Sequence, residues 1–65
     1  MRIELNGQAV TTEAATLAAL LDEQGFDATS VATALDGEFV PRGARQGVAL
    51  MDGVKVEVLS PMQGG

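Results

Sequence analysis

VKVEV, the stretch from Val54 to Val58, alternates apolar and charged side chains. This period of two predicts a β-strand whose valines face a core and whose Lys55 and Glu57 face water. Asp52-Gly53 marks a turn before the strand, and Ser60-Pro61 stops it. We therefore expect a strand with one buried face in the centre of a sheet, close to the end of the sequence.

A hairpin is predicted upstream of this strand, followed later by a second hairpin or a strand with a tight turn. In RIELNGQAVTT, residues 2–12, the Asn6-Gly7 pair is a strong signal for a two-residue turn that needs positive φ at both positions. In VATALDGEFVP, residues 31–41, Asp36-Gly37 has the same role, and Pro41 ends the pairing. The chain therefore supplies strands on both sides of its middle region.

One helix is predicted between the hairpins, in TLAALLDEQGF, residues 16–26. Thr16 is suited to be the N-cap, and leucines at Leu17, i+3 and i+4 form one apolar face. Gly25 is suited to end the helix in a left-handed conformation. Acids near this end, such as Glu23, are unfavourable for the helix dipole, so we expect another contact to fix it.

The order of hairpin, helix and further strands predicts an α+β fold of the β-grasp (ubiquitin-like) type. We expect a mixed four- to five-stranded sheet with one main helix packed on one face. Residues 42–47, RGARQG, are predicted to be a loop with room for one helical turn. The domain is expected to span residues 1–59, with a flexible tail over 60–65. The predicted core is Ile3, Leu5, Val10, Leu17, Leu20, Leu21, Val56 and Val58.

Composition excludes several classes of function. The net charge is −5, and there is no Cys, His, Tyr or Trp, which argues against nucleic-acid binding, disulfides and a His or Cys metal site. The core must be built from aliphatic residues, Met and the two Phe. No apolar run is long enough to cross a membrane, and the first residues lack the apolar segment of a signal peptide. We expect a cytoplasmic protein that does not bind membranes.

The sequence offers no conventional catalytic group of its own. A nucleophilic serine needs a base, yet there is no His, and Lys55 is the only lysine. The remaining candidate is the end of the sequence, where we predict that the α-carboxylate of Gly65 is the group that reacts. A carboxylate must be activated, most simply as an acyl-adenylate, inside another protein's active site. Gly64 and Gly65 lack a Cβ and can pass through a narrow channel.

Ordering such a tail costs roughly 1–2 kcal/mol per residue, so the folded body must bind the partner beside it. We therefore predict that Met62, Gln63 and Gly64 thread into the partner and that Leu59 anchors the body. Glu57 and Glu4 are predicted to form an acidic rim on the same outer face of the sheet. An apolar anchor with an acidic rim suits a partner whose face is apolar and basic.

Over essentially its whole length, the chain resembles the thiamine-biosynthesis sulfur carriers of the ThiS type. The resemblance rests on NG after the first strand, TLAALL, ALDGEFVPR, LMDGVKVEVL and the terminal GG. It implies that an E1-like adenylyltransferase of the ThiF type adenylates Gly65 with ATP. It further implies that sulfur, supplied through a cysteine desulfurase, converts Gly65 to a thiocarboxylate. A thiazole synthase of the ThiG type then receives the sulfur. The chain would bind no cofactor and would not itself be an enzyme.

Several other functions are consistent with the same sequence. The small subunit of molybdopterin synthase and other thiocarboxylate carriers share the fold and the tail. A ubiquitin-like modifier would use the same tail, although Lys55 as the only lysine disfavours chains of this protein. A non-covalent β-grasp adaptor would need no chemistry at Gly65.

Overall fold

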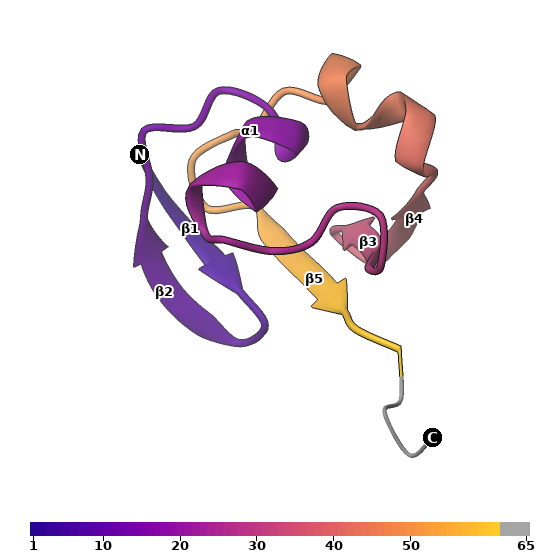
Figure 1. The fold of residues 1–65 in the computed structure, drawn as a ribbon. Helices are drawn as coiled ribbons and strands as arrows, with labels where there is room; N and C mark the ends of the chain where they lie inside the picture. The colour runs from indigo at the N-terminus through magenta and orange to yellow at the C-terminus, as the bar shows by residue number, and fades with distance from the viewer. Residues whose placement is uncertain (62–65) are drawn as a thin grey trace.

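The computed structural model describes residues 1–61 and shows a five-stranded sheet in the order β2-β1-β5-β3-β4 (Figure 1). One helix crosses one face of this sheet, as the sequence predicts. β5 pairs in parallel with β1, and all other pairs are antiparallel, so the sheet is mixed. The elements are β1 (Arg2–Leu5), β2 (Gln8–Thr11), α1 (Leu17–Glu23), β3 (Ala32–Leu35), β4 (Glu38–Val40), the 3₁₀ helix η1 (Arg42–Gly47) and β5 (Lys55–Leu59).

The central strand is β5, the strand first read from the valine alternation. It lies between β1 and β3, with Leu5 opposite Val56 on one side and Thr33 opposite Val58 on the other. Val54, Val56 and Val58 are buried, whereas Lys55 and Glu57 are exposed. The predicted strand and its predicted faces are therefore confirmed.

Both predicted hairpin turns are present, with the expected left-handed residues. Asn6 has φ 50° and Gly7 84°, and Asp36 has φ 48° and Gly37 86°. Each turn has positive φ at two successive positions, as a tight turn between twisted antiparallel strands requires.

The helix α1 begins and ends as its sequence predicts. The hydroxyl oxygen of Thr16 accepts a hydrogen bond from the Ala19 N–H at 3.1 Å. At the other end Gly25 has φ 79°, and the Phe26 N–H donates to the Leu21 carbonyl at 2.9 Å, which closes a Schellman motif. The leucine face points into the core, where Leu17 and Leu20 are fully buried.

The contact that fixes the C-terminal end of α1 comes from the segment before the helix. The carboxylate of Glu23 accepts hydrogen bonds from the hydroxyl of Thr12 and, at 3.1 Å, from the N–H of Glu13. The Thr12 hydroxyl, followed by the Glu13 N–H, lowers the pKa of Glu23. The hydrogen bonds from residues 12 and 13 thus offset the unfavourable interaction of the Glu23 carboxylate with the helix dipole.

The core is larger than predicted and includes all but one of the residues expected there. Val10 is only partly buried, because it lies on the edge strand β2. Phe26 is partly buried against the core, but Phe39 is 69% exposed, so the expectation that both Phe build the core is wrong. Met1 and Met51 are exposed as well, and Met62 lies outside the described residues. The buried apolar residues are Ile3, Leu5, Ala14, Leu17, Leu20, Leu21, Val40, Leu50, Val54, Val56 and Val58.

The segment predicted as a loop, residues 42–47, is the 3₁₀ helix η1, and it carries a buried arginine. Arg45 is 4% exposed and donates to the hydroxyl of Thr33 and to the carbonyls of Ala28 and Val31. These bonds attach η1 to the start of β3 and to the segment before it. Sequence reasoning did not find this role.

No helix in residues 1–61 is long and apolar enough to span a membrane.

Candidate functional site

The last element before the predicted reactive group in the sequence is β5. This strand ends at Leu59, and Ser60 and Pro61 after it are exposed (Figure 1). The predicted tail residues Met62, Gln63, Gly64 and Gly65 lie outside the described residues. The site is therefore built from β5 and from the strands that hold it.

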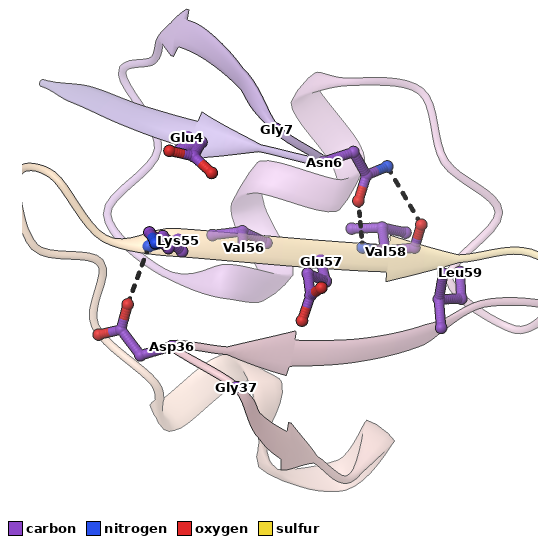
Figure 2. A pocket seen from close by; sticks show the side chains of 10 residues that line it. All are labelled: Glu4, Asn6, Gly7, Asp36, Gly37, Lys55, Val56, Glu57, Val58 and Leu59. Carbon is purple, nitrogen blue, oxygen red and sulfur yellow. Dashed lines mark hydrogen bonds between the residues drawn. The ribbon is translucent and has the colours of Figure 1, made fainter.

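The face of the sheet turned away from α1 gathers the three predicted docking residues. Glu4 is in register with Lys55, and Glu57 and Leu59 follow at alternate positions of β5. Because the residues between them on β5 are buried against the core, these side chains point outward. Figure 2 shows Glu4, Lys55, Glu57 and Leu59 around an open hollow over β5. The structure thus places Glu4, Glu57 and Leu59 on one face.

Two exposed apolar side chains on this face come from different strands. Leu59 of β5 is 68% exposed and lies opposite Ala32 of β3. Phe39 of β4 is 69% exposed and lies opposite Ala34 of β3. We call Leu59, Ala32, Ala34 and Phe39 the outer apolar strip.

Of the two large apolar side chains in this strip, Leu59 was predicted from the sequence and Phe39 was not. A signal for it exists, because Val40 is buried and successive residues of a strand face opposite sides of the sheet. Using that signal requires knowing that Val40, rather than Phe39, faces the helix. A three-residue strand is too short to show its own alternation.

Carboxylates border the strip. Glu57 lies opposite Ala34, next to the strip, and Glu4 is half-buried one strand further away. Lys55 lies beside Glu4 in the register and its side chain is exposed, so this face also carries a positive charge. A partner that presents apolar side chains surrounded by cations fits this face.

Within residues 1–61, no group of three or more His, Cys, Asp or Glu side chains is arranged to hold a metal ion. The carboxylates with altered acidity have local structural partners. The side chain of Thr29, followed by that of Ser30, lowers the pKa of Asp27 in the loop before β3. In this part of the chain the hydroxyl–carboxylate contacts hold a loop and a helix end in place.

The sequence model of the ThiS family matches residues 2–65. A crystal structure of a thiamine biosynthesis protein (ThiS) from Geobacter metallireducens is similar, with a TM-score of 0.85 and 32% sequence identity over 100% of both chains. A solution NMR structure of a thiamine biosynthesis protein from the same organism has a TM-score of 0.82 and 32% identity, covering 100% of this chain and 88% of that one. Comparison with curated protein sequences finds no match.

Proposed function

The chain belongs to the ThiS family of thiamine biosynthesis proteins, and we propose that it carries sulfur on the terminal carboxyl group of Gly65. The observation that carries this proposal is the family match, which extends through Gly64-Gly65 and thus includes the pair that follows the central strand. Residues 1–61 offer a binding face, so we place catalysis in partner enzymes. We also propose that the protein works in the cytoplasm.

The proposed chemistry has two steps on one carbon. An activating enzyme of the ThiF type transfers AMP from ATP to the Gly65 carboxylate, which releases pyrophosphate and forms an acyl-adenylate. Hydrosulfide, released when a thiol reduces the persulfide that a cysteine desulfurase forms, then attacks this carbon. The C–S bond forms, the bond to the AMP oxygen breaks, and AMP leaves with the electron pair. The product is a thiocarboxylate, and ATP is bound by the enzyme rather than by this chain.

We also propose that the outer face holds the folded body on its partner enzymes. The body must stay bound while the terminal residues enter an active site, because ordering each residue costs roughly 1–2 kcal/mol. The outer apolar strip and the carboxylates of Glu4 and Glu57 border the strand that leads to the tail. We propose that this face binds both the activating enzyme and a thiazole synthase of the ThiG type. The two partners would then bind in turn.

An intact-mass experiment tests the proposal directly. The chain is incubated with an activating enzyme, ATP and a sulfur source, and its mass is measured. We expect an increase equal to the replacement of one oxygen by sulfur, located on Gly65 by fragmentation. A chain that lacks Gly65 is the matched control and should not change.

An unchanged mass with an enzyme that adenylates another carrier would contradict the proposal. An isopeptide adduct on a partner lysine would instead support a protein modifier. The same spectrum therefore distinguishes the two kinds of tail chemistry.

A further inference from the structure

The side chain of Asn6 makes two hydrogen bonds to one residue of β5. Its Nδ2 donates to the carbonyl of Val58 at 3.2 Å, and its Oδ1 accepts from the N–H of Val58 at 2.8 Å (Figure 2). A carbonyl only accepts and an N–H only donates, so the two partners determine the orientation of the amide. One side chain thereby holds both backbone groups of Val58.

This contact continues the β1–β5 pairing beyond the end of β1. The backbone pairing runs from the Glu4 N–H to the Val54 carbonyl and from the Asn6 N–H to the Val56 carbonyl. The next partners in a parallel ladder would be the carbonyl of residue 6 and the N–H of residue 8, on either side of Val58. The chain has by then turned into β2, and the amide of Asn6 replaces both groups.

Asp36 makes a comparable contact at the opposite end of β5. Its carboxylate accepts from the Lys55 N–H at 3.0 Å, and its own N–H donates to the Lys55 carbonyl at 2.8 Å. Asn6 and Asp36 share positive φ, a following glycine and a bond to β5, but only Asn6 holds the end from which the chain continues toward Gly65. Asp36 therefore serves as the matched control for Asn6.

We propose that Asn6 is a positioning residue, which fixes the direction in which the chain leaves the sheet toward Gly65; its effect on the reaction rests on the proposed function. Gly65 is only seven positions after Val58 in the sequence, so the backbone at Val58 determines where the segment that carries the proposed reactive group begins. A displacement of about 1 Å can cost a hundredfold in rate. Holding Val58 on both sides limits such changes. On the other side, β3 pairs with β5 as far as Leu59.

The test compares the full chain with Asn6→Gly and Asp36→Gly. Glycine accepts the positive φ of both positions, so each substitution removes the side-chain contact without straining the turn. The first measurement is amide hydrogen exchange at Val58. We expect Asn6→Gly to speed it by about tenfold while Val56 stays protected, and Asp36→Gly to leave it unchanged.

The second measurement is the rate of adenylation by the activating enzyme. We expect Asn6→Gly to lower kcat by about tenfold with KM within about twofold, because the body still docks. Asp36→Gly should retain the wild-type kcat. A merely structural contact would lower the melting temperature without this separation of kcat from KM.

The two measurements test the contact with Val58 and its role in the reaction separately. Unchanged exchange at Val58 in Asn6→Gly would overturn the positioning contact itself. Faster exchange with a wild-type kcat would overturn its role in the reaction. If the wild-type chain is not adenylated by a competent enzyme, the proposed function fails together with that role, whereas the exchange result still decides the contact.

Discussion

The guanidinium of Arg45 donates from Nε to the hydroxyl of Thr33 at 3.0 Å, and both side chains are buried. The Thr33 hydroxyl in turn donates to the carbonyl of Val40 at 3.0 Å, which links η1, β3 and β4 in one chain of hydrogen bonds. All acceptors of Arg45 are neutral. Arg45 therefore stabilises the fold through its hydrogen bonds to neutral oxygens rather than through an ion pair.

We therefore predict that Arg45→Ala lowers the free energy of unfolding by about 2–3 kcal/mol, because it leaves the acceptors without their charged donor. Chemical denaturation measures this change. Arg42→Ala is the matched control in the same 3₁₀ helix, where the side chain is exposed, and should change stability by less than about 0.5 kcal/mol. Equal effects of the two substitutions would show that burial of Arg45 contributes nothing.

The features that sequence reasoning found are those whose cause is local. Asn6-Gly7 and Asp36-Gly37 require a tight turn through their own conformational preference, and Gly25 ends α1 for the same reason. The alternation of Val54–Val58 likewise needs no knowledge of the partners. These signals were sufficient to predict β5 as a central strand and to predict the buried face of the helix.

The features that were missed depend on residues far apart in the sequence. Arg45 is buried because the carbonyls of Ala28 and Val31 converge on its guanidinium, and no local pattern shows that convergence. The second role of Asn6 depends on Val58, at the other end of the chain. Its turn function was visible in the dipeptide, whereas its contact with β5 needs the fold.

Leu20 of α1 tests the predicted helix face. It is fully buried, so Leu20→Ala removes apolar contacts and leaves a cavity, and we expect a loss of about 2–5 kcal/mol in unfolding free energy. Leu59→Ala, at an exposed position of β5, provides the comparison and should cost under about 1 kcal/mol. A loss below about 0.5 kcal/mol for Leu20→Ala would contradict the packing of α1 against the sheet.

Glu23 should make stability depend on pH. Its pKa is lowered from 4.5, chiefly by the Thr12 hydroxyl, so the folded state favours the carboxylate. The stabilisation is present above the unfolded pKa and is lost as the pH falls through the lowered folded value. Glu23→Gln should therefore melt below wild type at pH values above 4.5 and approach it as the pH falls below 4.5.

Thermal melts at pH values above and below 4.5 measure this convergence. Thr12→Val removes the main donor, so adding it to Glu23→Gln should change the pH dependence little further. If the double variant showed the sum of the two single-variant changes in pH dependence, Thr12 and Glu23 would act independently, contrary to the hydrogen bond between them.

Glu57 tests the charge of the outer face. Because it is exposed beside the outer apolar strip, Glu57→Lys should slow association with the activating enzyme rather than speed dissociation. Stopped-flow or surface-based kinetics at low and high salt separate the two rates. Salt should reduce the difference from wild type, since exposed charges are screened beyond about 10 Å at 0.1 M. A salt-independent defect would indicate another cause.

The outer apolar strip is tested by Leu59→Asp and Phe39→Asp, which place a charge at either end of it. Both side chains are exposed, so the melting temperature should change little, whereas binding to the activating enzyme and to the thiazole synthase should weaken by at least about tenfold each. Met51→Asp makes the same charge change at a side chain that is equally exposed, 68%, but lies in the loop before β5, and should bind as wild type. Wild-type affinity of Leu59→Asp and Phe39→Asp for both partners would remove this face from the proposal. An equal loss in Met51→Asp would show that added negative charge, rather than the strip, governs binding.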